Sequence, residues 1–68
     1  MTREPVEKLF TPQELAAYLD VPVSTLYDWR WRGEGPRGFR VGKRIRYRRS
    51  DVEQWIHQRL QESHPNRR

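Results

Sequence analysis

The side chains of this sequence that could do chemistry are mostly arginines, and they are concentrated in one stretch. Between Arg30 and Arg49 the chain has nine basic residues and one acid, Glu34, so this stretch carries a formal charge of +8. The rest of the chain has five basic and eight acidic residues. Because guanidinium groups bind phosphate or guanine through paired hydrogen bonds, a dense arginine cluster favours nucleic acid as the partner. The alternative interpretation is a solvated basic face that only aids solubility.

Few residues suit catalysis or metal binding. The sequence has no cysteine, which excludes disulfides and thiolate zinc sites, and its two histidines, His57 and His64, do not make a structural metal site alone. No glycine-rich phosphate loop leads into a helix, and no histidine stands beside an obvious nucleophile. We therefore expect no enzyme activity, no cofactor and no metal.

The 68 residues suffice for one small domain. We expect the folded domain over 9–61, a flexible N-terminal arm over 1–8 and a flexible C-terminal tail over 62–68, because both ends are polar. The sequence contains neither a long apolar run nor a signal peptide, so we expect a cytosolic protein without membrane contact.

A first helix is predicted over residues 12–19. Thr11 can cap it, Glu14 completes a capping box, and Pro12 suits the first helical position. The apolar face of this helix comprises Leu15, Ala16 and Leu19.

A tight turn and a second helix follow. Asp20 tolerates the left-handed conformation that such a turn requires. Ser24 is the expected cap of the second helix, which should end at Gly33. Leu26 and Trp29, three residues apart, share one helical face and should point inward. Two helices joined in this way are typical of a helix-turn-helix, whose second helix enters the DNA major groove.

Trp31 lies roughly 200° around the second helix from Trp29, so the two indoles cannot face the same core. Two interpretations remain open: Trp31 packs under the following loop, or it is exposed for contact. The outer or flanking faces of the helix carry Ser24, Thr25, Tyr27, Asp28 and Arg32.

A glycine-rich loop over 33–38 precedes a predicted β-hairpin, in which apolar and basic residues alternate. A two-residue turn would pair Val41 with Arg44 and divide the apolar residues between the two faces. A three-residue tip over 42–44 instead pairs Val41 with Ile45, and Phe39 with Tyr47, on one buried face. We predict the second register. Its basic side chains are Arg40 and Arg46 on the open face, with Lys43 and Arg44 at the tip.

A third helix is predicted over 51–61. Ser50, Asp51 and Glu53 suit a second capping box, with acids in the first turn. The apolar stripe of this helix comprises Val52, Trp55, Ile56 and Leu60.

The order of these elements over Leu9–Leu60 resembles the small excisionase-like DNA-binding proteins, whose domain is similar to the winged domain of MerR-type regulators. The predicted fold is mainly α with a small β-hairpin, a winged helix-turn-helix. The matching pieces are Phe10-Thr11-Pro12-Gln13-Glu14-Leu15-Ala16, Val23-Ser24-Thr25-Leu26-Tyr27-Asp28-Trp29, Gly35-Pro36, Phe39-Arg40-Val41-Gly42-Lys43-Arg44-Ile45-Arg46-Tyr47 and Ser50-Asp51-Val52-Glu53-Gln54-Trp55-Ile56.

The resemblance implies that the second helix enters the major groove and that the hairpin, or wing, lies along the backbone or in the neighbouring minor groove. The implied DNA-binding residues of the helix are Ser24, Thr25, Tyr27, Asp28, Arg30 and Arg32. Those of the wing are Arg40, Lys43, Arg44 and Arg46.

The resemblance also implies a function. Excisionases of this kind bind repeated sites beside a phage attachment site, bend the DNA and direct the integrase toward excision, which places this protein in a bacterial host cell. Because nothing in the chain suggests a dimerisation helix, we expect a monomer in free solution and neighbouring copies on DNA. The C-terminal tail is a candidate contact with integrase. The alternatives are a small transcriptional regulator with the same domain and, in another class, a protein-binding adaptor that uses Trp31 and the tail.

Overall fold

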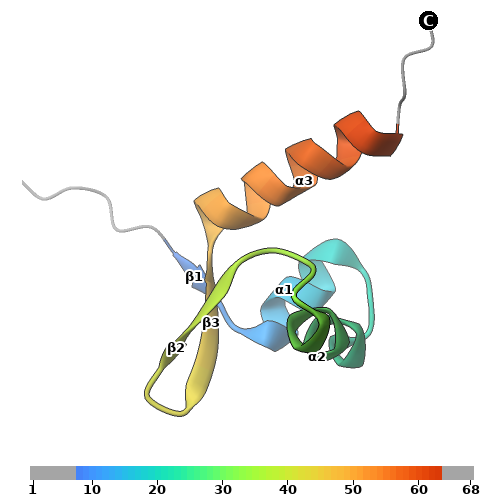
Figure 1. The fold of residues 1–68 in the computed structure, drawn as a ribbon. Helices are drawn as coiled ribbons and strands as arrows, with labels where there is room; N and C mark the ends of the chain where they lie inside the picture. Colours follow the sequence, from blue (N-terminus) through green and yellow to red (C-terminus); the bar gives the residue numbers. More distant parts are fainter. Residues whose placement is uncertain (1–7, 64–68) are drawn as a thin grey trace, which may run out of the picture.

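The computed structural model describes residues 8–63, and in this range three helices and a small sheet follow one another (Figure 1). The elements are β1 (Leu9–Phe10), α1 (Pro12–Leu19), α2 (Val23–Arg32), β2 (Gly38–Val41), β3 (Arg44–Arg48) and α3 (Arg49–Ser63). This confirms the mainly helical winged helix-turn-helix fold. The short strand β1 was not predicted. Most of the expected arm, 1–7, and the end of the expected tail, 64–68, lie outside the described residues.

The start of α1 confirms the first capping box. The backbone N–H of Glu14 donates to Thr11 Oγ1 at 3.0 Å, and the backbone N–H of Thr11 donates to Glu14 Oε1 at 3.0 Å. That second bond lowers the pKa of the Glu14 carboxyl, since it favours the charged form. The start of α1 is therefore set by local hydrogen bonds, as the sequence predicts.

The turn between the two helices has the predicted left-handed residue. Asp20 has φ 60° and ψ 47°, and the next N–H, of Val21, donates to Ala16 O at 2.9 Å. The predicted cap of the second helix was wrong, because Ser24 lies inside α2 and Pro22 precedes its first residue. Pro22 has φ −64°, and its carbonyl accepts the first helical bond from the Thr25 N–H at 3.0 Å, so the helix begins earlier.

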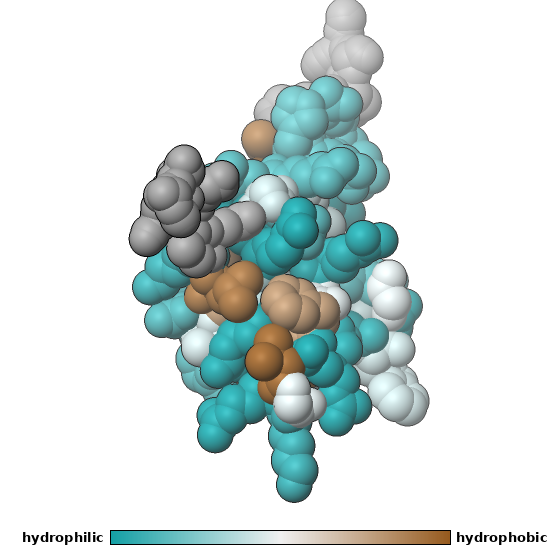
Figure 2. All heavy atoms as spheres, turned by 90° about the vertical axis from the view of Figure 1, so that its left-hand side faces the viewer, coloured by the Kyte–Doolittle hydropathy of each residue, from teal (hydrophilic) through white to brown (hydrophobic). Residues whose placement is uncertain are grey.

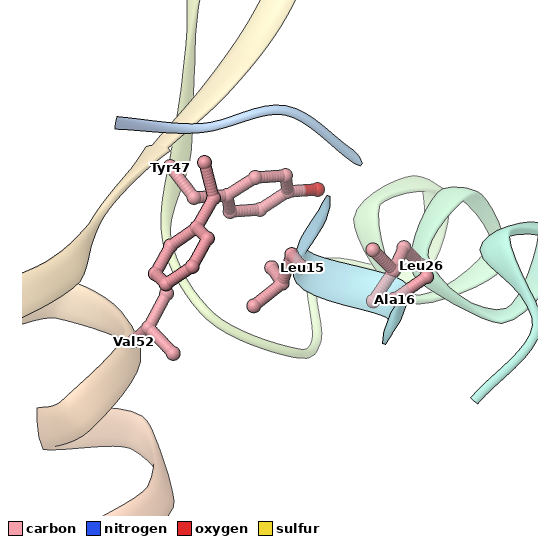
Figure 3. Close-up of a cluster of buried hydrophobic side chains, with 6 residues drawn as sticks. Leu15, Ala16, Leu26, Tyr47 and Val52 are labelled. Carbon is pink, nitrogen blue, oxygen red and sulfur yellow. The ribbon is translucent and has the colours of Figure 1, made fainter. Parts of the chain in front are cut away.

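The core lies where α1, α2, the sheet and the start of α3 meet. Its buried side chains are Phe10, Leu15, Ala16, Leu26, Tyr47 and Val52. Figure 3 shows the ring of Tyr47 reaching from β3 toward Leu15 on α1, with Val52 approaching from α3. Every element except β2 thus contributes one or two anchors to a single cluster, which fixes the position of β3 relative to the two helices.

Only the first half of α3 follows its predicted stripe. Val52 is fully buried and Trp55 and Ile56 are half-buried, whereas Leu60 is 53% exposed because α3 runs away from the body of the domain (Figure 1). The predicted start of α3 was two residues late, because the helix already begins at Arg49 and Ser50 is its second residue. At the other end α3 includes Glu62 and Ser63, which were expected in the tail.

The sheet is antiparallel with strand order β1-β3-β2, and the predicted hairpin register was wrong. The tip has two residues, Gly42 and Lys43, so Val41 pairs with Arg44 and Phe39 with Arg46. Two features account for this register, one in the turn and one a contact between the strands. Gly42 takes φ +64°, as the first residue of a tight hairpin turn can, and Gly38 lies opposite Tyr47, where a Cβ atom would come within 2.8 Å of the ring.

Candidate nucleic-acid interface

The basic stretch between Arg30 and Arg49 divides into paired and unpaired side chains. Arg32 contacts Asp28 and Glu34, Arg48 contacts Asp51, and Arg49 contacts Glu53. The other six of the nine have no carboxylate of the described residues within ion-pair distance. We call these six the free cations: Arg30, Arg37, Arg40, Lys43, Arg44 and Arg46.

The free cations all lie on the last turn of α2, the following loop and the hairpin. No acidic residue occurs between Gly35 and Ser50, so the strand arginines other than Arg48, which reaches Asp51, have no acid close to them in the sequence. Unpaired exposed guanidinium groups repel one another, and an anion that binds them relieves that repulsion. The arrangement suits a polyanion that extends from α2 to the wing.

A groove joins α2 to the wing beside the first residues of β3, which extend beyond its pairing with β1. Its walls comprise Pro12 and Gln13 of α1, Tyr27 of α2, and Lys43, Arg44, Ile45 and Arg46 of the hairpin. Arg46 is held along β3 because its Nη1 donates to Ile45 O at 2.8 Å. The groove therefore brings three of the predicted wing residues together with one predicted helix residue.

The fourth predicted wing residue, Arg40, lies on a different face. Paired residues share one side of a sheet and neighbours alternate, so Arg40 is on the side of its partner Ile45 and of Tyr47. Arg44 and Arg46 are on the opposite side. The prediction that Arg40 and Arg46 share the open face was therefore wrong, as a consequence of the one-residue difference in register.

The outer face of the sheet carries exposed apolar side chains, two of which, Phe39 and Val41, were expected in the core. Phe39 is 37% exposed and Val41 51% exposed, and Leu9 of β1 is 38% exposed. Figure 2 shows apolar patches framed by hydrophilic surface on the side of the molecule where the sheet lies. The expectation that Phe39 and Val41 are buried beside Tyr47 and Ile45 is thus corrected: of the hairpin strands, β3 alone sends apolar side chains into the core.

The predicted DNA-binding residues of α2 also differ from one another in exposure and pairing. Ser24 and Tyr27 are exposed, and Thr25 is half-buried. Asp28 and Arg32 bind each other, with Arg32 Nη2 at 2.7 Å from Asp28 Oδ2. Arg30 is exposed and lies close enough to Tyr47 for its charge to oppose partly the rise in the Tyr47 pKa that burial causes.

The loop that links α2 to the wing is fixed by close packing. A Cβ atom on Gly35 would come within 2.9 Å of Trp29 Cε3, so the loop backbone lies directly against that indole. Trp29 in turn contacts Trp55 of α3, with ring centroids 5.2 Å apart. These contacts hold the wing at a set position relative to α2.

Comparison with known proteins decides the family. Residues 9–60 match the model of the helix-turn-helix domain family. The chain belongs to that family. A search of the curated proteins and a search of the solved structures each find no match. The helix-turn-helix domain is a DNA-binding domain, and in this one α1 and α2 form the motif while β2 and β3 form the wing.

Sequence reasoning left two further residues of this helix-turn-helix domain out of the DNA-binding candidates. Gln13 stands exposed at the start of α1 and lines the groove, and Arg37 of the loop is one of the free cations. Nothing in the pattern around Gln13 marks it, because only the fold brings α1 beside the wing. Arg37 belongs to the basic stretch, which is the signal that could have identified it.

The structure also settles the two open interpretations of Trp31. Its side chain is 87% exposed, so it does not pack under the loop of the helix-turn-helix domain.

Among residues 8–63, no group of three or more His, Cys, Asp or Glu side chains is placed to hold a metal ion. Within the same range, no helix has the length and apolar character that a membrane span requires.

Proposed function

We propose that this helix-turn-helix protein is a non-enzymatic, sequence-preferring double-stranded DNA-binding protein that acts as an excisionase. The observation that carries the DNA-binding part is the set of free cations on α2, the loop and the wing. In this proposal α2 lies in the major groove with Ser24 and Tyr27 facing the base edges, and Lys43, Arg44 and Arg46 bind phosphates beside it. Phosphate contacts set affinity and register, whereas base contacts set sequence preference.

The finer role rests on the likeness of the element order to excisionase-like proteins. A single domain of this size makes few base contacts, so we propose that monomers bind adjacent repeats beside an attachment site. Each bound copy holds the next at a high effective concentration, which combines weak sites into a strong one. A row of wings in successive grooves would bend the DNA and favour excision by the integrase.

Binding is tested by fluorescence anisotropy on labelled duplexes across a series of salt concentrations. With about four phosphate contacts, the logarithm of the association constant should fall by about 3.6 for each tenfold rise in salt. Affinity that hardly changes with salt would contradict DNA binding and favour the protein-binding adaptor.

The excisionase role is tested by adding the protein to an integrase encoded beside its own gene. The DNA substrate carries both attachment-site halves. We expect more excised product, and cooperative gel shifts on two or three repeats compared with one. Binding to DNA without an effect on excision would overturn this role and favour a small transcriptional regulator. A dimer in sedimentation of the free protein would contradict assembly from monomers.

A further inference from the structure

Trp31 projects from the last turn of α2 with 87% of its surface exposed, more than any other large apolar side chain among the described residues. The other two tryptophans, Trp29 and Trp55, pack against each other. Tyr27 is 46% exposed and precedes Trp31 by four residues, so the two rings lie on one face of the helix. Tyr27 also borders the groove beside the wing, which places this aromatic face next to the proposed DNA surface.

The charged neighbours of Trp31 leave the indole as the projecting group. Arg32 is held by Asp28 at 2.7 Å and by Glu34 at 3.7 Å, so its guanidinium is engaged along the protein surface. Arg30 is a free cation. A partner that covers Trp31 therefore meets an apolar ring beside unpaired positive charge, while the nearby carboxylates are already neutralised. This combination fits DNA better than an acidic or apolar protein surface alone.

An intact duplex offers few apolar groups to such a ring. In the major groove the base edges present hydrogen-bond donors and acceptors, and the apolar exception is the C5-methyl group of thymine. We propose that Trp31 contacts thymine methyl groups at the end of the site reached by the last turn of α2, and so determines sequence preference there. The inference rests on the proposed binding of duplex DNA by α2, and adds a residue outside the predicted DNA-binding set.

Replacement of thymine by uracil tests this contact, because uracil has the same hydrogen-bonding edge without the methyl group. The probe is the tightest duplex obtained by selection from random sequence, with each thymine replaced in turn. For the unmodified protein, one or two replacements should weaken binding about four-fold each, the worth of one buried methyl group. The same replacements should have no effect on Trp31→Ala, and 5-methylcytosine at those positions should bind the unmodified protein better than cytosine.

Two variants make the test specific. Trp31→Phe retains an apolar ring and should keep part of the discrimination between thymine and uracil. Phe39→Ala removes an exposed aromatic ring from the outer sheet face and should keep all of it. Because Trp31 is exposed, the Trp31→Ala variant should fold, which circular dichroism checks.

Equal binding of thymine and uracil duplexes by the unmodified protein would overturn the inference, and so would unchanged discrimination in Trp31→Ala. Either result, with steep salt dependence retained, leaves DNA binding intact and removes Trp31 from the residues that determine sequence preference. Failure of the unmodified protein to bind any duplex would instead contradict the proposed function itself.

Discussion

Both arginines of α3 have a carboxylate partner, whereas of the four arginines on the wing strands only Arg48 has one. On α3, Arg49 Nε lies 2.9 Å from Glu53 Oε2 and Arg59 Nη1 lies 3.0 Å from Glu62 Oε1. On the wing, Arg40, Arg44 and Arg46 have no carboxylate of residues 8–63 within ion-pair distance. The two regions show that exposed arginines of the same type can serve the protein itself in one place and remain available to a ligand in another.

The difference follows from sequence spacing. A helix brings residues three or four apart together, so an acid at that distance neutralises each α3 arginine. A strand sends neighbours to opposite faces, and the stretch around the wing has no acid to offer. Both arrangements therefore depend on residues that are close together in the sequence. They lead to opposite expectations for DNA binding, which substitutions in each region can separate.

The largest effect is expected from removing charge on the wing. Lys43→Ala, Arg44→Ala and Arg46→Ala together should weaken DNA binding about 100-fold at physiological salt, because each lost phosphate contact costs about five-fold there. The slope of the logarithm of the association constant against the logarithm of the salt concentration should decrease in magnitude by about three. The matched control is Arg49→Ala with Arg59→Ala, which should change affinity only slightly. Similar losses from both variants would remove the distinction between the two regions.

The next effect concerns the position of the wing. Gly38→Ala places a Cβ atom within 2.8 Å of the Tyr47 ring, and Tyr47 is 2% exposed in the core. Forcing the ring aside should lower the free energy of unfolding by about 1–3 kcal/mol, as overpacking of a core does. Urea denaturation measures this loss. Arg40→Ala, two residues along the same strand and exposed, is the control and should change stability little.

Tyr47 also predicts the response to alkaline pH. Its burial raises the pKa of the phenol above the ordinary value of 10.0, so the unfolded chain loses this proton first. The contribution to stability is complete below pH 10 and declines as the pH rises above it. Tyr47→Phe should reduce the decline in thermal midpoint between pH 9 and 11. An unchanged alkaline profile in this variant would show that another group controls it.

The sequence predicts those parts of the fold that depend on near neighbours. The Thr11–Glu14 capping box, the left-handed Asp20 and the helix end at Gly33 each rest on residues within one turn, and all three are confirmed. Helix starts with weaker signals were less predictable: α2 begins at Val23 and α3 at Arg49, each before the serine that suits a cap.

The hairpin register could not be read from apolar alternation alone. Alternation favoured the register that buries Phe39 and Val41, whereas the observed register depends on Gly38 fitting beneath the ring of Tyr47. That fit is a tertiary contact, which the pattern does not contain. The same limit applies to the site: charge identified the wing arginines, but only the fold brings Gln13 beside them and leaves Trp31 uncovered.

The smallest effect is expected from changes on α3, which test the difference between its paired arginines and the free cations. Arg59→Ala removes an ion pair whose side chains are 59% and 67% exposed, so solvent screens it and its loss should cost at most about 0.5 kcal/mol. DNA affinity should stay within about two-fold, because a cation already neutralised by Glu62 releases few counterions. Glu62→Gln sharpens the contrast: it frees Arg59 without removing it. If the free cations bind DNA because of their place on α2 and the wing, freeing a cation on α3 should leave affinity unchanged. A rise in affinity comparable to one phosphate contact would show instead that the DNA also reaches α3.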